Sequence, residues 1–402
     1  MPSKDDPDAD HAFVLADLLH DGDSGGPGED HTERTRGRRR RRNRILLIGV
    51  SSFLALIILL GAVFVGLMLK QVGRAFKGNP IDAIGSVLGL TGAPLKTDQY
   101  GNTNIVVFGT TEDDPGHDTS NSLTDSIMVI SLNQKRKEAV TFSVPRDLWV
   151  TYPTTSCAAG TQGKINATYA CGLNGDHGGL RGNEDAGQTA LSDVVSRVLG
   201  IQLQYTVHVN MTVVRDAVNA VNGITIDIDS PDPRGISEPA MSRRCSNHDC
   251  VIDFPNGPAH LNGNQAMWLS QARNDGEGYG LPRGDFDRQM YQRKMAIAIE
   301  QKASAISLFA RPFEVLDLLD AMGNNVRSNI PSDVLGAFID AARKLPSGQI
   351  YSIDFDTQGL YTTGMYGSAS IVRPVAGLFD YSRVQRFTRS LLRGHIPAGV
   401  KR

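Results

Sequence analysis

The sequence predicts an α/β fold, with a central β-sheet flanked by helices and preceded by one transmembrane helix. From about residue 96 onward, short apolar segments alternate with segments of helical periodicity, which is typical of a sheet covered by helices. One uncharged stretch of 25 residues, 45–69, is long enough to cross a bilayer. No change in composition divides residues 96–402, so we expect one large domain there.

The first predicted element is the transmembrane helix from Ile45 to Leu69. A buried helix that is apolar on every side over this length is rare, and a signal peptide has a shorter apolar region with a small-residue cleavage site. Eight arginines lie between residues 34 and 44, directly before this segment. Positive residues stay on the cytoplasmic side. We therefore expect a single-pass protein of the cell membrane, with a cytoplasmic N-terminus and residues 70–402 extracytoplasmic.

The segments on either side of the predicted span differ in character. Residues 1–44 form a predicted cytoplasmic tail, which is rich in Asp, Gly and Ser up to residue 33 and buries too little apolar surface to fold. The arginine run that ends this tail is explained by topology and by contact with anionic membrane lipid. Because the chain has a net charge of −2 and no other basic run, we expect no nucleic-acid partner. Residues 70–95 form a predicted juxtamembrane stem.

All four cysteines lie in the part of the chain that is predicted to be extracytoplasmic, where disulfides persist. Their spacing fits no common zinc site, and sequence alone allows three pairings. Proximity along the chain favours Cys157 with Cys171 and Cys245 with Cys250. Each pair would close a loop rich in Gly, Asn and Ser.

Strands and helices follow one another through residues 96–402, and we expect 306–402 to pack on the same sheet. Apolar runs bounded by turn residues predict strands at 104–108, 126–132, 139–144, 204–209, 224–228 and 350–355. Helical periodicity predicts helices at 187–199, 212–221, 264–273, 286–303, 312–322, 331–344 and 382–393.

Polar residues with chemical potential follow two of the predicted strands. Asp125 lies where the chain returns from an acidic loop, and a carboxylate there can hold a hard cation such as Mg²⁺ or cap a turn. Arg146 follows a strand and a proline, so it can grip phosphate bidentately or form a structural turn with Asp147. Lys164 lies on a later loop, where a solvated lysine is the ordinary alternative.

A third polar group surrounds the start of the predicted helix 286–303. Asp285 is a good N-cap for this helix, and Arg288 and Gln292 share one of its faces. A helix N-terminus with several arginines fits an anion, although the interspersed acidic residues also fit a salt-bridged surface helix. The three groups together suit a metal-bound phosphate or pyrophosphate. The arginines of this third group are Arg273, Arg283, Arg288 and Arg293.

The sequence resembles the LytR-CpsA-Psr family in five ordered motifs between about residues 100 and 305. The resemblance implies a central mixed β-sheet flanked by helices. It also implies an extracytoplasmic phosphotransferase that moves a glycopolymer from a polyprenyl-pyrophosphate carrier onto peptidoglycan. The motifs read Asn104-Ile-Val-Val-Phe-Gly-Thr110, Thr124-Asp-Ser-Ile-Met-Val-Ile-Ser-Leu-Asn133, Ser143-Val-Pro-Arg-Asp-Leu-Trp-Val150, Gly163-Lys-Ile-Asn-Ala-Thr-Tyr169 and Arg283-Gly-Asp-Phe-Asp-Arg288 with Gln292.

The resemblance also implies roles for individual residues. Asp125 matches an aspartate that binds Mg²⁺, and a cluster of arginines binds the pyrophosphate. The residues predicted as catalytic are Asp125, Arg146, Asp147 and Arg288. Those predicted to bind substrate are Lys164, Arg273, Arg283, Asp285 and Gln292.

Two positions depart from the family pattern. Thr111 stands where the family usually has an aspartate, and Leu123 stands where it usually has an arginine. Three acidic residues follow Thr111, and we expect Asp113 to replace the lost carboxylate in part, as a second metal ligand beside Asp125. The departures leave open a non-catalytic regulator of wall assembly that binds lipid pyrophosphate. A polyprenyl-pyrophosphate pyrophosphatase, with water in place of the acceptor, is the other alternative.

Overall fold

The computed structural model describes residues 66–110, 122–153, 160–173, 184–239, 252–274, 277–304 and 325–398, apart from 68, 347–348 and 354. It also describes residues 157, 317, 321 and 323. The chain divides into two compact units, Met1–Ala62 and Val63–Arg402, and the described residues all belong to the second. Within them, no helix is long and apolar enough to cross a bilayer. Some predictions concern residues outside these ranges. They are those for Asp113, Thr111, Cys245 and Cys250, for nearly all of the span 45–69 and for most of the helix 312–322.

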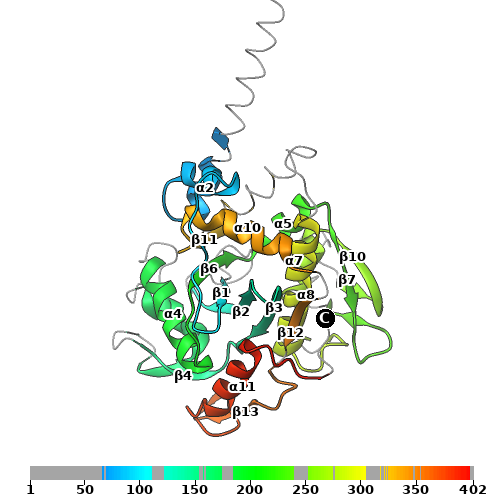
Figure 1. The fold of residues 1–402 in the computed structure, drawn as a ribbon. Helices are drawn as coiled ribbons and strands as arrows, with labels where there is room; N and C mark the ends of the chain where they lie inside the picture. Colours follow the sequence, from blue (N-terminus) through cyan, green and yellow to red (C-terminus); the bar gives the residue numbers. More distant parts are fainter. Residues whose placement is uncertain are drawn as a thin grey trace, which may run out of the picture. The chain divides into compact units, whose positions relative to one another are not determined.

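A mixed sheet of six strands forms the centre of residues 63–402 (Figure 1). Parallel and antiparallel pairs both occur, which confirms the predicted α/β fold with a central mixed sheet. Its strands, in their order across the sheet, are β11 (Val326–Ser328), β6 (Tyr205–Asn210), β1 (Asn102–Thr110), β2 (Thr124–Asn133), β3 (Glu138–Ser143) and β12 (Ile350–Ile353).

The strand directions bring distant parts of the chain to one edge of this sheet. β1 runs parallel to β6, and β3 runs parallel to β12, whereas β2 is antiparallel to both β1 and β3. Consequently β1, β3, β6 and β12 end at the same edge at which β2 begins. We call this the carboxyl edge. It brings Asp125, at the start of β2, close to Arg146, which follows the end of β3.

Two helices cover one face of the sheet. They are α4 (Glu184–Leu199) and α11 (Ser382–Leu392). Phe108, Val129 and Phe142 from the sheet pack with Leu191 and Val195 of α4 in one core, and all five side chains are fully buried. Each such side chain contributes about 1.5–3 kcal/mol of hydrophobic stabilisation. This face is therefore a filled core.

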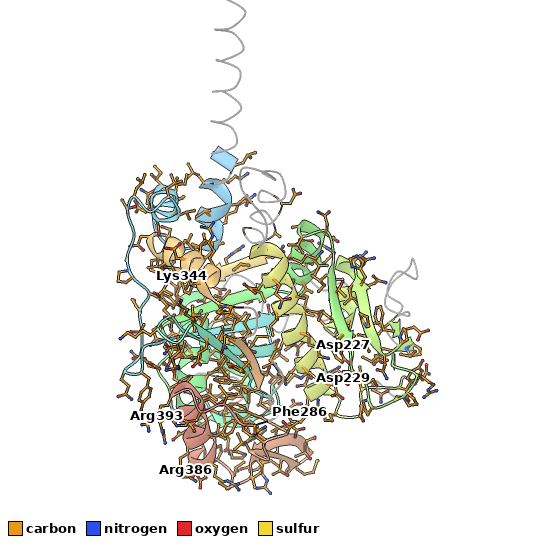
Figure 2. The ribbon with its side chains drawn as sticks, turned by 45° about the vertical axis from the view of Figure 1, so that its right-hand side comes forward. Asp227, Asp229, Phe286, Lys344, Arg386 and Arg393 are labelled. Carbon is orange, nitrogen blue, oxygen red and sulfur yellow. A yellow bond between two sulfur atoms is a disulfide. The ribbon has the colours of Figure 1, made fainter. Side chains whose placement is uncertain are left out.

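The opposite face is only partly filled. It carries α8 (Asp285–Ser304) and α10 (Leu335–Lys344), and Figure 2 shows Phe286 at the start of α8 well away from Lys344 at the end of α10. Four apolar side chains on the inner strands of this face remain partly exposed, although inner strands normally bury theirs. They lie on one face because Val107 pairs with Val207 and because alternate residues of a strand share a face. We call them the apolar stripe: Val107, Ile130, Val207 and Val209.

A smaller layer packs beside α8. β7 (Ile224–Ile228) pairs with β10 (Gly257–Leu261) in a separate two-stranded sheet, so this predicted strand does not extend the central sheet. The helices α5 (Thr212–Ala220) and α7 (Gly263–Leu269) join it in a second core. Tyr291, Met295 and Ala298 of α8 belong to the same core, so this layer packs against the middle of that helix.

The N-terminal part of the described chain packs against α10. Between the helix α2 (Pro80–Val87) and the turn η3 (Ser332–Val334), Ser86 Oγ donates a hydrogen bond to the Asp333 carbonyl oxygen at 2.6 Å and accepts one from the Gly336 amide at 2.9 Å. The approach is so close that a Cβ on Gly336 would lie 2.0 Å from the Ser86 carbonyl oxygen. Residues of the predicted stem thus pack tightly against the unit that contains the sheet.

Residues 306–402 were expected to pack on the central sheet, and the described part of this range does so. β11, β12, α10 and α11 all pack in or on the central sheet. Several short elements of the chain were not predicted from the sequence. The unpredicted elements are α2, β10 and β11, described above, together with β4 (Trp149–Thr151), β5 (Gln162–Lys164), η1 (Ile165–Ala167), α3 (Thr168–Gly172), β8 (Ile236–Ser237), β9 (Asp253–Phe254), β13 (Tyr361–Tyr366) and β14 (Ala369–Pro374).

A buried polar network holds the carboxyl end of β1 against α4. His208 Nδ1 lies 3.0 Å from Glu184 Oε1, and His208 Nε2 lies 2.8 Å from Thr110 Oγ1. Tyr169 Oη donates to Glu184 Oε2 at 2.6 Å. Burial alone would raise the pKa of Glu184, but hydrogen bonds from His208, Gln188 and Tyr169 and attraction to His208 lower the pKa to about 2. The network therefore requires an ionised carboxylate.

Glu184→Gln is expected to lower the free energy of unfolding by about 2 kcal/mol at pH 7. Because the folded-state pKa lies below the ordinary value of 4.5, the contribution is complete above that value and disappears as the pH falls toward 2. The difference between variant and wild type should therefore shrink from about pH 5 downward. Thermal unfolding of the detergent-solubilised chain at several pH values measures this. Asp185→Asn, on the exposed neighbour, is the control; an equal loss in both variants would contradict the role of the network.

Candidate active site

Asp125 and Arg146 form an ion pair at the carboxyl edge, with Arg146 Nη1 donating to Asp125 Oδ1. Arg146 Nε lies 3.8 Å from Asp285 Oδ1, which comes from the start of α8. Burial would lower the pKa of Arg146, but the charges of Asp125, Asp285 and Asp147 together raise it. The guanidinium thus lies among three carboxylates that keep it charged.

Arg288 places a second guanidinium beside the first, and its side chain is buried, with 4% of its surface exposed. Its Nη2 donates to the Asp125 carbonyl oxygen at 2.6 Å and lies 2.5 Å from Asp285 Oδ1. Burial lowers the pKa of Arg288. The carboxylates of Asp285 and Asp125 oppose this shift, whereas the positive charges of Arg146 and Arg273 add to it. An anion placed here would relieve this repulsion. Arg273 is near enough to act on Arg288 through its charge.

Three polar atoms of this cluster are buried without a hydrogen-bond partner among the described residues. They are Arg146 Nε, Arg288 Nε and Asp285 Oδ1. Asp285 Oδ1 forms an ion pair with Arg288 Nη2, but this contact is not a hydrogen bond. Buried donors are nearly always satisfied in folded proteins. Two unsatisfied guanidinium donors at one edge of a sheet are what an anionic ligand would complete.

Asp285 has a different position from the one predicted. It is the first residue of α8 and does not cap the helix from outside. Its Oδ2 accepts a hydrogen bond from Gln289 Nε2 at 2.6 Å, and its Oδ1 faces Arg288 and Arg146. The arginines attract the carboxylate more strongly than the free amides of the first turn do. Asp285 is therefore part of the charge cluster.

Gln292 and Arg293 fasten α8 to the sheet. Gln292 Nε2 donates to the Ser270 carbonyl oxygen at 2.8 Å, and its Oε1 accepts from Ser126 Oγ at 2.7 Å. Arg293 Nη1 donates to Ser143 Oγ at 2.7 Å. Ser126 was not among the predicted site residues, although its position directly after Asp125 in a motif could have indicated it. These contacts fix the position of α8, and with it Arg288, relative to β2.

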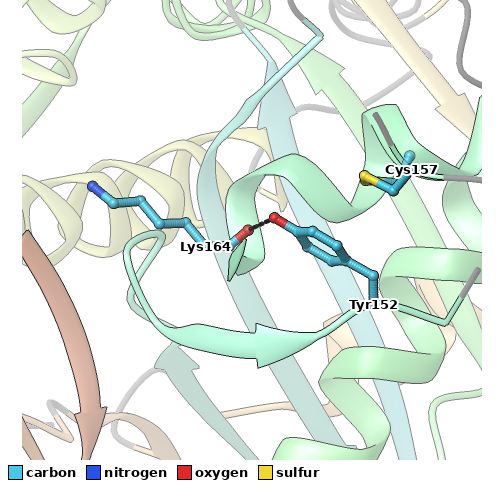
Figure 3. Close-up of a disulfide and its surroundings, with 4 residues drawn as sticks. Tyr152, Cys157 and Lys164 are labelled. Carbon is cyan, nitrogen blue, oxygen red and sulfur yellow. Dashed lines mark hydrogen bonds between the residues drawn. A yellow bond between two sulfur atoms is a disulfide. The ribbon is translucent and has the colours of Figure 1, made fainter. Parts of the chain in front are cut away.

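Lys164 and Asp147 form a second ion pair next to the cluster, with Lys164 Nζ 2.8 Å from Asp147 Oδ1. Both groups are about one-third exposed, so the pair is open to solvent. The Lys164 carbonyl oxygen accepts a hydrogen bond from Tyr152 Oη at 3.1 Å, and the lysine side chain extends away from that ring (Figure 3). The backbone at Lys164 is thus fixed, while its ammonium group faces the site.

A disulfide closes the loop that contains Lys164. Cys157 is bonded to Cys171 across 14 residues, the first of the two pairings that proximity favoured (Figure 3). Both cysteines are buried in the core under α4. The bond restrains the segment that contains β5 and α3, which overlap the two ends of the fourth motif.

Removal of this disulfide is expected to destabilise the chain. A closed loop of this length reduces the entropy of the unfolded chain by an amount worth about 3 kcal/mol. We expect the double variant Cys157→Ala/Cys171→Ala to unfold at a temperature several degrees lower, at about 2–4 °C per kcal/mol for a chain of this size. Scanning calorimetry without and with a reductant measures the change. An unchanged melting temperature in the variant would contradict the structural role of the bond.

Another predicted residue, Arg283, does not join the cluster. Arg283 lies 2.7 Å from Asp287 and 3.6 Å from Asp356, so two carboxylates already compensate its charge. Asp113 lies outside the described residues. Within the described ranges, no group of three or more His, Cys, Asp or Glu side chains forms a possible metal site.

Comparison with known proteins extends this geometry. A family model described as the LytR_cpsA_psr family matches residues 80–372, from the start of α2 into β14. The chain belongs to the LytR_cpsA_psr family. All the predicted site residues lie within the matched region.

Relatives of this LytR_cpsA_psr protein include two enzymes named polyisoprenyl-teichoic acid–peptidoglycan teichoic acid transferase TagU. The enzyme of Bacillus mycoides is 28% identical over 273 residues, which cover 65% of this chain and 75% of the relative. That of Bacillus anthracis is 29% identical over 286 residues, covering 68% and 78%. Among solved structures, TagV of B. subtilis has a TM-score of 0.50 at 22% identity, covering 75% of this chain and all of TagV. TagT bound to LI-WTA has a TM-score of 0.52 at 17% identity, covering 76% and 96%. These structures share the fold.

Proposed function

We propose that this protein is an extracytoplasmic phosphotransferase that moves a glycopolymer from a polyprenyl-pyrophosphate carrier onto peptidoglycan. The observation that carries the proposal is the pair of guanidinium groups of Arg146 and Arg288, whose buried Nε donors have no hydrogen-bond partner among the described residues. Guanidinium groups bind phosphate oxygens bidentately. The names of the TagU relatives, teichoic acid transferases that act on peptidoglycan, support the same reaction.

The apolar stripe gives the carrier's lipid chain a place beside this charge. Val209 is the last residue but one of β6 and pairs with Gly109, so the stripe reaches the carboxyl edge. A prenyl chain against these partly exposed side chains would bury apolar surface at about 25 cal/mol per Å². The pyrophosphate at its end would then lie near Arg288. One ligand with an apolar tail and a doubly charged head thus suits both features.

The proposed reaction exchanges one phosphoanhydride bond for a phosphodiester. An acceptor hydroxyl attacks the phosphorus nearest the glycopolymer, its oxygen–phosphorus bond forms, and the bond to the lipid phosphate breaks. Arg146, Arg288 and Arg273 stabilise the charge that develops on the leaving lipid phosphate. Asp125 or Asp147 accepts the proton of the hydroxyl. Because the anhydride supplies the free energy, no ATP is required outside the cytoplasm.

The described residues fit the Mg²⁺ that the family resemblance implies. Magnesium ions are commonly bound through one or two carboxylates and the substrate's own phosphate oxygens. Asp125 and Asp285 supply carboxylates, both in contact with Arg146, and Asp285 Oδ1 has no hydrogen-bond partner among the described residues. We propose that Asp125 holds the ion with the substrate, and that Asp113 adds a ligand. The ion would neutralise pyrophosphate charge.

We also propose that residues 45–69 anchor the chain in the cell membrane, with residues 1–44 in the cytoplasm, 70–95 as a stem and 96–402 as the extracytoplasmic catalytic domain. Ile81, Leu88 and Leu90, in and just after α2, are each more than 60% exposed. Apolar side chains at this position in the chain suit the interfacial region of the bilayer. Such an arrangement would keep the site within reach of a membrane-bound carrier.

Incubation of the full chain in lipid vesicles with a polyprenyl-pyrophosphate glycan, Mg²⁺ and peptidoglycan tests the function. We expect polymer to become covalently attached only when peptidoglycan is present. Release of lipid monophosphate without an acceptor would instead support a pyrophosphatase. Tight binding without either product would support the regulatory protein.

A further inference from the structure

An aromatic pair, partly buried at Trp149 and exposed at Tyr366, lies beside the proposed active site. The rings of Trp149 in β4 and Tyr366 in β13 lie 4.8 Å apart, at an angle of 34°. Tyr366 is 41% exposed and belongs to none of the hydrophobic core clusters. Gln162 Nε2 donates to Tyr366 Oη at 3.1 Å and adds an amide at the border of the pair.

The pair shares a surface with the ion pair of the active site. In the antiparallel pairing of β4 and β5, Trp149 is opposite Lys164 and Thr151 is opposite Gln162, so these four side chains lie on one face. The other face is closed, because Val150 is fully buried and a Cβ on Gly163 would overlap the ring of Tyr152. The accessible face of this hairpin therefore carries an indole, a lysine and an amide.

The β13–β14 hairpin is attached to the segment that carries the catalytic motif. The Val372 amide donates to the Asp147 carbonyl oxygen at 2.9 Å, and Leu148 forms a β-bridge with Val372. Tyr381 Oη donates to the Trp149 carbonyl oxygen at 3.1 Å. The positions of Tyr366 and Trp149 relative to Asp147 are thus fixed by backbone contacts.

We propose that Trp149 and Tyr366 form the acceptor subsite, where a sugar ring of a peptidoglycan glycan strand stacks beside Asp147 and Lys164. This inference rests on the proposed function. The face of an aromatic ring is negative, and the axial C–H groups of a pyranose present a weakly positive apolar face to it. Gln162 and Lys164 offer hydrogen bonds to the hydroxyl and acyl oxygens of a sugar. The acceptor hydroxyl would then lie near Asp147, which makes this carboxylate the better placed of the two proposed proton acceptors.

The position of the pair favours the acceptor over the glycopolymer donor. Leu148 and Val372 belong to the core that α4 and α11 cover, whereas the apolar stripe proposed for the lipid lies on the opposite face of the sheet. Figure 1 shows β13 and α2 at opposite ends of residues 63–402. A strand of the wall would thus reach the site from the end opposite to α2, the first helix after the proposed membrane anchor.

The test compares acceptor dependence in the full-length protein in vesicles, with soluble, uncrosslinked glycan strands of peptidoglycan as the probe. Tyr366→Ala and Trp149→Ala are each expected to raise the half-saturating concentration of glycan strands about tenfold. Tyr366→Phe keeps the ring and should stay within about twofold of wild type. Met365→Ala is the matched control, because this side chain is 66% exposed on the other side of the same strand. Binding of the donor should be the same in all variants.

Direct binding gives a second readout. The chain has two tryptophans, and the other one, Trp268, is buried. Glycan strands should therefore change the emission of wild type and leave that of Trp149→Phe unchanged. An unaltered acceptor dependence in Tyr366→Ala would overturn the subsite while the transferase stands. A raised requirement for donor in place of acceptor would assign the pair to the glycopolymer and overturn it as well. Absence of transfer by wild type would contradict the proposed function itself, before any variant is compared.

Discussion

Arg288→Ala is expected to reduce acceptor-dependent transfer by about 10²–10³-fold, the largest effect of any single substitution that we predict. Arg288 is the most deeply buried cation of the cluster, and it contacts Asp285 as well as the backbone of Asp125. Removal of its guanidinium takes away a buried positive charge and the unsatisfied Nε donor, and it leaves Asp285 with one partner fewer. Initial rates of polymer attachment to peptidoglycan measure the loss.

Two further variants make this result specific. Arg288→Lys keeps the charge but loses the planar fork, so we expect it to recover only a small part of the activity. Arg386→Ala removes an exposed arginine of α11, which Figure 2 shows beside Arg393, and should leave the rate unchanged. Far-ultraviolet circular dichroism reports whether each variant is folded. A folded Arg288→Ala protein with nearly normal transfer would refute the charge cluster as the catalytic site.

Asp125→Asn is expected to reduce transfer by about 10²-fold, with the half-saturating concentration of Mg²⁺ raised several-fold. The substitution keeps the shape of the side chain but removes its charge, so Arg146 loses its ion-pair partner and the proposed metal site loses its central carboxylate. Rates measured over a range of Mg²⁺ concentrations separate these two effects. A loss of metal affinity is partly restored by excess Mg²⁺, whereas a misplaced Arg146 is not.

The control for this substitution is Asp340→Asn, on an exposed aspartate of α10, which should have no effect on either quantity. The outcome also separates the proposed functions. A regulator that only binds lipid pyrophosphate would tolerate Asp125→Asn. A wild-type protein that binds the donor normally but transfers nothing would therefore favour the regulator. Loss of transfer with retained donor binding supports the transferase.

The central sheet was predictable from the sequence because its strands are apolar runs of ordinary length. The predicted strand 139–144 differs from β3 by one residue at each end. The hairpins were not predictable in the same way. β4 has three residues, which is too short for a periodic pattern. β13 mixes Thr and Gly with Tyr and Met without regular alternation, and its partner strand β14 is the one that contacts Asp147. The strand 224–228 was correctly located, but its partner sheet depends on packing against α8.

The candidate site was predicted in part, from its motifs. The expectation that Asp125, Arg146 and Arg288 act together agrees with their contacts in the structure. Sequence spacing could not show that Arg283 is compensated by Asp356, because these residues are 73 positions apart and meet only in the folded chain. The network of Glu184 and His208 has the same origin, since its members come from α4 and β6. Long-range partners of charged residues are set by topology, which motifs do not encode.

Following the phosphorus atoms through the reaction shows whether an acceptor hydroxyl attacks the phosphorus nearest the glycopolymer. A donor labelled at the phosphorus nearest the glycopolymer is incubated with the full chain, Mg²⁺ and peptidoglycan, and the products are separated by size and by extraction into organic solvent. We predict that the label becomes part of an acid-labile phosphodiester on the glycan strands, while unlabelled lipid monophosphate is released in equal amount. Label that stays with the lipid, or that is found only on free polymer, would contradict attack by an acceptor hydroxyl at the Arg146–Arg288 cluster.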